Sequence, residues 1–301
     1  MARVWAGVIL GILLASTSPA LFAQGAKKHT IEDRDLVTAD NFKIKVTYYK
    51  SLGGQDAPVI VLLHGKRGTR QQWKTLATDL QQKGDFAVIA VDLRGHGESP
   101  FPKKGGLSKN DYQAMVAFDM EAVKDFIMEE HQKKNLNMNK LGIVGSDFSA
   151  AVAVLYTELD WGKIPFDDSP TLEGRTPKGQ DVQALALISP DATVPGLTVT
   201  KSMPVIRALK RPVVIAVSEK NAGDVSAANK IFDLLVVKKD KEKEGDQNDP
   251  PYLWKYEANF SGMDLVTRNA NLRKHIFEFL TKYVKEHPSE WRDRRSQLER
   301  D

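Results

Sequence analysis

The sequence predicts an α/β fold: a mostly parallel β-sheet with helices on both faces and a leading antiparallel pair of strands. Short, continuous apolar runs alternate with longer stretches that carry apolar residues at helical spacing, as in parallel sheets whose strands are joined by helices. The two segments ahead of the first apolar run alternate apolar and polar residues, as strands with one solvent face do. The 301 residues, 42% of them hydrophobic, suffice for one large core.

The predicted elements follow each other in a regular order. The leading strand pair is expected at residues 29–38 and 42–50, joined by residues 39–41. The strands expected after it are residues 58–63, 86–91, 141–144, 182–188, 212–217 and 252–259. The helices expected between and after them are residues 70–82, 111–131, 150–156, 202–209, 225–235 and 271–284. Two segments are expected to be irregular, the Pro- and Gly-rich residues 161–180 and the charged residues 238–251.

The two ends of the chain are expected to lie outside the core. Residues 1–23 begin with Arg3, continue with an apolar stretch and finish with small residues near Ala23, which is the pattern of an export signal peptide. The apolar stretch is too short to span a bilayer comfortably, so we expect cleavage and a mature domain at residues 24–301 without a stable membrane span. The expected location is periplasmic or extracellular. Residues 287–301 are highly charged, and we expect them to form a frayed tail.

Composition narrows the range of partners and cofactors. The net charge of +4 becomes +3 without the leader, because Arg3 is the only charged residue there, and this small excess gives no reason to expect nucleic acid. Cysteine is absent, so disulfides and thiolate metal ligands are excluded. No histidine or carboxylate cluster has the spacing of a metal site, and no glycine motif has that of a nucleotide cofactor. We therefore expect neither a metal nor a cofactor.

One stretch, LGIVGSDFSAAVAV at residues 141–154, combines a buried strand, a tight turn and a helix. Strand, sharp turn and helix form the setting of a nucleophile elbow, whose pattern is G-x-S-x-G. Here the central position holds Asp147, and the last glycine position holds Ser149. Gly145 and Ser149 are small enough to let the strand and helix backbones approach each other. The sequence thus predicts the geometry of the elbow without its usual serine.

Together with two upstream motifs, this stretch resembles the α/β-hydrolase fold superfamily. LLHG at residues 62–65 is similar to the strand end that carries part of the oxyanion hole, and DLRGHGES at residues 92–99 is similar to the turn after the next strand. The resemblance covers essentially the whole mature chain and implies the α/β-hydrolase fold in one domain. It assigns the oxyanion-hole donors to the backbone at Lys66 and Phe148.

The resemblance also identifies the triad positions, and each holds an unusual residue. The nucleophile position is Asp147, and dehalogenases and epoxide hydrolases of the superfamily use an aspartate there. The acid position after the strand at 212–217 holds Asn221, and the histidine position between the last strand and the last helix holds Met263. Asp191, after the preceding strand, is another place where the superfamily puts its acid. A nucleophile needs a base to complete its cycle, and none of the six histidines is placed to act as one.

Two functions remain open from the sequence. In the first, the chain is an exported hydrolase-fold protein without triad catalysis that binds a small molecule or a protein. In the second, it is an active hydrolase of esters or similar small substrates that uses Asp147 or a flanking serine, with Asp191 as the alternative acid. A base within hydrogen-bond reach of Asp147 would distinguish them. We further expect Asp147 to be an anion held by Lys66, Arg67 and the Phe148 amide, with a lowered pKa.

Overall fold

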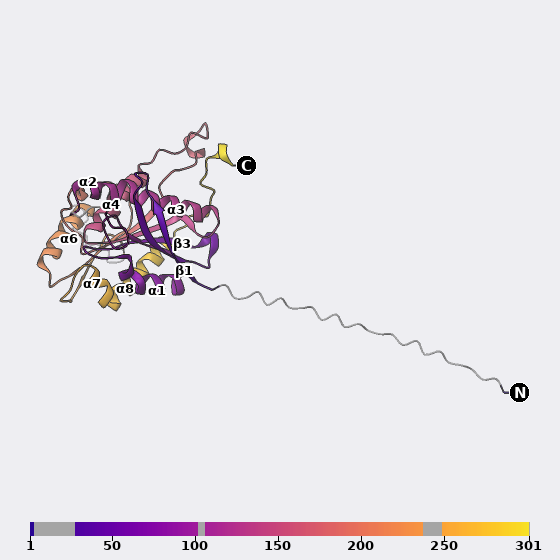
Figure 1. Ribbon diagram of the computed structural model, residues 1–301, viewed down its shortest axis with the longest axis horizontal. Coiled ribbons are helices and arrows are strands. Elements are labelled where there is room, and N and C mark those ends of the chain that lie inside the picture. The colour runs from indigo at the N-terminus through magenta and orange to yellow at the C-terminus, as the bar shows by residue number, and fades with distance from the viewer. Residues whose placement is uncertain (3–27, 102–105, 237–248, 301) are drawn as a thin grey trace.

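The computed structural model describes residues 1–2, 28–101, 106–236 and 249–300 of the chain. All but the first two residues of the predicted leader, and the greater part of the charged segment 238–251, lie outside the described residues. From residue 28 onward the chain forms a central sheet between two layers of helices (Figure 1).

The sheet has eight strands in the order β1-β2-β4-β3-β5-β6-β7-β8. Their bounds are β1 Thr30–Val37, β2 Lys43–Lys50, β3 Pro58–Leu63, β4 Ala87–Asp92, β5 Asn137–Ser146, β6 Val182–Ile188, β7 Val213–Ser218 and β8 Tyr252–Tyr256. β1 pairs with β2, and β2 with β4, in antiparallel orientation, and all other neighbours are parallel. The predicted mostly parallel sheet with a leading antiparallel pair is confirmed.

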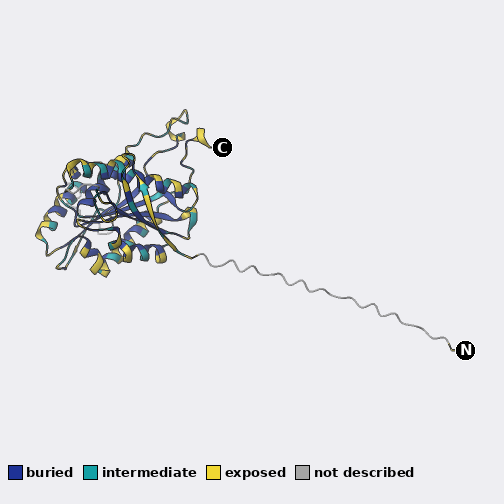
Figure 2. Cartoon of the chain, in the orientation of Figure 1, coloured by how far each residue is buried: buried dark blue, intermediate teal, exposed yellow. Residues whose placement is uncertain are grey.

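Helices cover both faces of this sheet. Their bounds are α1 Lys74–Gly84, α2 Lys109–Ala114, α3 Met120–Gln132, α4 Phe148–Trp161, α5 Val199–Ala208, α6 Ala222–Leu235, α7 Met263–Arg268 and α8 Ala270–Leu280. Along β3, Val61 packs into the core beneath α3 to α6, whereas its neighbour Leu62 packs into the core beneath α1, α7 and α8. All of β3 is buried, as Figure 2 shows for the centre of the sheet, which explains why its sequence is continuously apolar. Among the described residues, no helix combines the length and apolarity needed to cross a membrane.

Two of the predicted helices are interrupted. The helix expected at residues 70–82 begins with a 3-10 turn, Arg70–Trp73, ahead of α1. The helix expected at residues 111–131 contains a π-helical turn, Met115–Asp119, between α2 and α3. This turn coincides with the buried Asp119, whose carboxylate accepts hydrogen bonds from the backbone and the guanidinium of Arg94 at 2.9 and 2.8 Å. The short helix α7 was not predicted, because it extends over only six residues.

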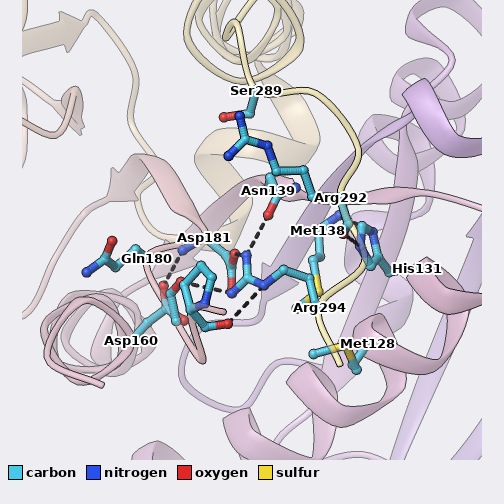
Figure 3. Close-up of polar contacts among 12 residues, drawn as sticks. Met128, His131, Met138, Asn139, Asp160, Gln180, Asp181, Ser289, Arg292 and Arg294 are labelled. Carbon is cyan, nitrogen blue, oxygen red and sulfur yellow. Dashed lines mark hydrogen bonds and ion pairs between the residues drawn. The ribbon is translucent and has the colours of Figure 1, made fainter. Parts of the chain in front are cut away.

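The C-terminal segment is packed against the domain, and the expectation of a frayed tail is wrong for residues 287–300. Arg294 is only 3% exposed. Its guanidinium pairs with Asp181 and donates to the carbonyl of Gly179 at 2.9 Å (Figure 3). The ring of Trp291 stacks on that of His131, with centroids 4.9 Å apart. The charge of this segment indicated solvent exposure, but its partners lie more than 100 positions away in the sequence.

Arg294 belongs to a buried cluster of four charged side chains at the amino end of β6. Lys124 pairs with both Asp160 and Asp181. Asp160 also accepts the backbone N–H groups of Asp181 and Val182 at 2.7 and 3.1 Å. Because two cations face two carboxylates, each buried charge has a partner, and removal of any one would leave an uncompensated charge. The cluster is structural, since it lies at the edge of the sheet opposite to the carboxyl end of β5.

Candidate functional site

The turn between β5 and α4 has the sharp geometry that the sequence predicts. β5 ends at Ser146, α4 begins at Phe148, and Asp147 between them has φ 53° and ψ −121°. A positive φ in a residue other than glycine costs about 1–3 kcal/mol and persists only where the surroundings enforce it. A Cβ on Gly145 would lie 2.7 Å from the carbonyl oxygen of Ser149, so only glycine allows the strand and the helix to come this close.

The Asp147 carboxyl group lies half-buried between two glycines from different loops. One of its oxygens, Oδ2, accepts the backbone N–H of Lys66 at 3.3 Å and the hydroxyl of Ser146 at 3.1 Å. A Cβ on Gly65 would overlap this oxygen, and a Cβ on Gly262 would lie 2.7 Å from Oδ1. The two glycines therefore provide the space that the carboxyl group occupies. The sequence indicated Gly65 only as part of the LLHG motif, because the distance of either glycine from Asp147 depends on the folded chain.

Burial, together with the nearby carboxylate of Asp191, raises the pKa of Asp147 to about 6. The hydroxyl of Ser146, the backbone N–H of Lys66 and the Lys66 charge offset part of this increase. The expectation of a lowered pKa is wrong. The Lys66 ammonium binds Asp191, at 2.8 Å, rather than Asp147. No cation in the described part of the chain therefore forms an ion pair with the Asp147 carboxyl group, and burial dominates its pKa.

Asp191 lies next to the elbow, as the alternative acid position requires. Its backbone N–H donates to the carbonyl of Asp147 at 3.3 Å, and its carboxylate forms the ion pair with Lys66. This pair raises the pKa of the Lys66 ammonium. The structure thus brings together Asp147, Asp191 and Lys66, three of the residues that the sequence singles out. Arg67, the second expected cation, is exposed.

The other two triad positions hold side chains with structural roles. Asn221 caps α6 by accepting the N–H of Asp224 at 3.2 Å, and its side-chain amide donates to Ser261 at 3.3 Å. Met263 is 5% exposed and begins α7. A thioether cannot take up a proton at neutral pH, so this position offers no base.

The serines that flank Asp147 are also engaged. Ser149 is fully buried, and its hydroxyl lies 3.0 Å from the carbonyl oxygen of Leu63 and 2.9 Å from that of Ser146. Ser146 is fully buried as well, and its hydroxyl donates to Asp147. Neither hydroxyl occupies the exposed apex of the turn, so neither has the position of a serine nucleophile.

Two histidines lie near the elbow in an aromatic row. The ring of His64 lies 4.6 Å from that of His96, which stacks on Phe148 with centroids 5.2 Å apart. Tyr112 contacts the same phenylalanine edge-on, at 5.7 Å. His64 accepts the N–H of Leu93 through Nε2, so Nδ1 carries the proton and donates to the carbonyl of Gly65 at 2.9 Å. Burial lowers the pKa of His64 to about 4. His64 is therefore a neutral structural residue with both ring nitrogens engaged.

Comparison with known proteins identifies the relatives of this chain. The sequence model of the family described as alpha/beta hydrolase fold matches residues 58–165. An sn-1-specific diacylglycerol lipase of Mus musculus is 33% identical over 99 residues, which are 33% of this chain and 32% of that protein. A soluble epoxide hydrolase of a Corynebacterium species is 30% identical over 97 residues, 32% of this chain and 28% of that protein. The chain thus matches about a third of the length of such relatives.

Solved structures match over a larger part of the chain. A dienelactone hydrolase of Anabaena variabilis has a TM-score of 0.60 at 12% identity and covers 86% of this chain and 100% of its own. An esterase of Pyrococcus furiosus has a TM-score of 0.56 at 14% identity and covers 85% of this chain and 94% of its own. Sequence identities this low show that these proteins share a fold with this chain and nothing further. The family match over residues 58–165, the strand order and the geometry of the elbow agree with one another, and the chain has the α/β-hydrolase fold.

Proposed function

We propose that this protein binds a small molecule at the β5–α4 elbow and does not hydrolyse it by a catalytic triad. One observation carries the proposal: the Asp147 carboxyl group accepts the N–H of Lys66, which is an oxyanion-hole donor position of the superfamily. The side chain at the nucleophile position thus occupies the backbone donor of the oxyanion hole. A substrate carbonyl could use this donor only after displacing the carboxyl group.

The missing base supports the same proposal. An acyl or alkyl intermediate on the nucleophile is released only when a base activates water. At the base position stands the buried Met263, and His64 is already engaged through both ring nitrogens. Restoring the triad is therefore expected to create an activity that the native chain does not have.

The experiment compares the native protein with a triple variant, Asp147→Ser, Asn221→Asp and Met263→His. We expect a fluorophosphonate probe to label the triple variant and leave the native protein unlabelled, and p-nitrophenyl acetate to be hydrolysed only by the variant. The matched control carries Asp147→Ala with the same two other substitutions, and it should be inactive. Native activity that exceeds that of a Met263→Ala variant would contradict the proposal.

A second candidate function is a hydrolase with Asp147 as its nucleophile, and the retained φ of 53° at Asp147 favours it. The similarity to a soluble epoxide hydrolase, 30% identical over 97 residues, adds to its support. In such a reaction a carboxylate oxygen of Asp147 attacks an epoxide carbon, the carbon–oxygen bond of the ring breaks, and the released alkoxide takes a proton from water. The product is a hydroxyalkyl ester of Asp147, which needs a base for its hydrolysis.

Styrene oxide tests this candidate. Intact-mass measurement after incubation distinguishes an unmodified chain from one that has gained the mass of a whole epoxide, with Asp147→Asn as the control. A stable adduct on the native chain would identify Asp147 as a nucleophile that stalls for lack of a base. Repeated release of the diol would establish an active hydrolase and refute the absence of catalysis.

We also propose that the protein is exported, as the Arg3-to-Ala23 pattern indicates. Mass spectrometry of the protein from its native host is expected to find a mature N-terminus near residues 20–24. An intact Met1 in the exported fraction would contradict this.

A further inference from the structure

Within the part of the chain that the structure describes, β8 is the outermost strand of the sheet, and a groove runs along it, three strands away from β5, the strand that leads into Asp147. Its volume is about 530 Å³, within the size range of sites that hold a small ligand or a short peptide. β8 forms one side of the groove with all of its residues, 252–256, and the segment from α8 onward forms the other side with His275, Glu278, Phe279, Lys282 and Tyr283.

The backbone of β8 presents hydrogen-bonding groups to this groove. Tyr256 directs its carbonyl toward β7, where it accepts the N–H of Glu219 at 3.0 Å. In a strand, the N–H and C=O groups of successive residues point alternately to the two sides. The backbone groups of Leu253 and Lys255 therefore face away from β7, toward the open side of the sheet. Leu253 and Lys255 line the groove although their side chains point to the opposite face of β8 from the aromatic ones, because their backbone groups face the groove.

An aromatic wall lies beside this row of backbone groups. Tyr252, Trp254 and Tyr256 share one face of β8 because they are two residues apart. The rings of Tyr252 and Trp254 are nearly parallel, at 18°, with centroids 6.0 Å apart. Phe279, on the side of the groove that α8 forms, contacts Trp254 edge-on at 6.2 Å. The hydroxyl of Tyr256 is bonded to Nδ1 of His275 at 2.7 Å.

The opposite face of β8 carries one positive charge next to the groove. Lys255 is exposed, and among the described residues no carboxylate lies within ion-pair distance of it. A strand laid beside β8 would place a side chain opposite Lys255 on this face and apolar side chains opposite the aromatic wall on the other. The edge therefore complements a peptide that alternates apolar residues with polar ones and has an acidic residue among the latter.

We propose that the β8 edge binds an extended peptide segment of a partner protein, which adds as a ninth strand between β8 and solvent. Main-chain hydrogen bonds to Leu253 and Lys255 give the affinity, and the aromatic wall with Lys255 selects the side chains, as in other cases of strand addition beside a helix. The proposal is independent of the chemistry at Asp147, so either can fail without the other.

A fluorescein-labelled peptide, Ac-Ser-Val-Glu-Val-Thr-Val-Ser-NH2, tests the proposal on the full-length protein by fluorescence polarisation. Two further peptides carry N-methyl groups on alternate sets of backbone amides. We expect one set to abolish binding and the other to be tolerated, because only one set faces β8. In hydrogen exchange followed by NMR, the amides of Leu253 and Lys255 should gain protection when the peptide is added, and that of Trp254, which faces β7, should not.

Charge exchange gives an independent readout. Lys255→Glu is expected to weaken binding about tenfold, and a peptide with Lys in place of Glu should restore it. Lys230→Glu, on the exposed side of α6, is the matched control and should change nothing. Absence of binding at about 1 mM peptide, or equal binding of all three peptides, would overturn the proposal. So would a dimeric mass in light scattering with Leu253 and Lys255 amides already protected, because a second copy would then occupy the edge.

Discussion

Replacing Asp147 with Asn is expected to stabilise the protein at pH 8 and to have little effect near pH 4. The substitution hardly changes the shape of the side chain, and the amide oxygen of Asn can still accept the N–H of Lys66. It removes a carboxylate whose pKa is raised from its ordinary value of 3.8 to about 6. Each unit of difference between the folded and unfolded pKa corresponds to about 1.4 kcal/mol. The charged form of Asp147 therefore destabilises the native state by about 3 kcal/mol.

The sign follows from proton binding. Between about pH 4 and pH 6 the folded protein retains a proton on Asp147 that the unfolded chain has already lost, so stability falls as the pH rises through this window. Below it both states are protonated, and above it the whole cost is present. The Asn variant lacks this titration. The free energies of unfolding are therefore expected to differ by about 3 kcal/mol at pH 8, with the variant more stable, and by less than about 1 kcal/mol at pH 4.

Urea unfolding of the native protein and the variant from pH 4 to pH 8 measures this difference directly, since titration of all other groups cancels. Asp79→Asn is the control, because its exposed pair with Lys83 on α1 is expected to contribute less than about 0.5 kcal/mol at any pH. A difference that is independent of pH, or an Asn variant that is less stable at pH 8, would refute the reasoning. The latter result would mean that a cation does pair with Asp147.

Three other sites give matched tests. Arg294→Met is expected to lower the free energy of unfolding by about 3 kcal/mol, because it leaves two buried carboxylates with one cation. Arg295→Met, on the exposed side of the same segment, is the control and should change the free energy of unfolding by less than about 0.5 kcal/mol. Urea unfolding of both variants measures the difference. Gly65→Ala is expected to destabilise by more than about 1 kcal/mol because its Cβ overlaps the Asp147 carboxyl group. Adding Asp147→Ala should remove most of that cost in a double-mutant cycle, and an additive result would disprove the overlap. The His64 ring should remain neutral down to about pH 5 in an NMR titration, since burial lowers its pKa to about 4; titration near 6.5 would contradict its burial as a neutral group.

The candidate site could be predicted in its residues but not in its interactions. The pattern around Asp147 predicts a sharp turn between a strand and a helix, and the turn is present. Asp191 and Lys66 were both named, and both lie beside it. The partner of Lys66 was predicted wrongly, because Lys66 could reach either of two carboxylates, and only the distances in the folded chain select Asp191 at 2.8 Å.

The layered architecture could be predicted from the amino-acid sequence, because apolar periodicity is a local property that each strand and helix carries in its own residues. Runs such as Pro58–Leu63 are buried on both faces wherever they are placed in a parallel sheet. The sign of the pKa shift of Asp147 and the burial of Arg294 could not be predicted, because both depend on the packing of the folded chain. Desolvation and ion pairing depend on groups that are distant in sequence, 81 positions away for Lys66 and Asp147 and 113 for Arg294 and Asp181. Which of them meet is fixed by the packing of the strands and loops and by no local pattern.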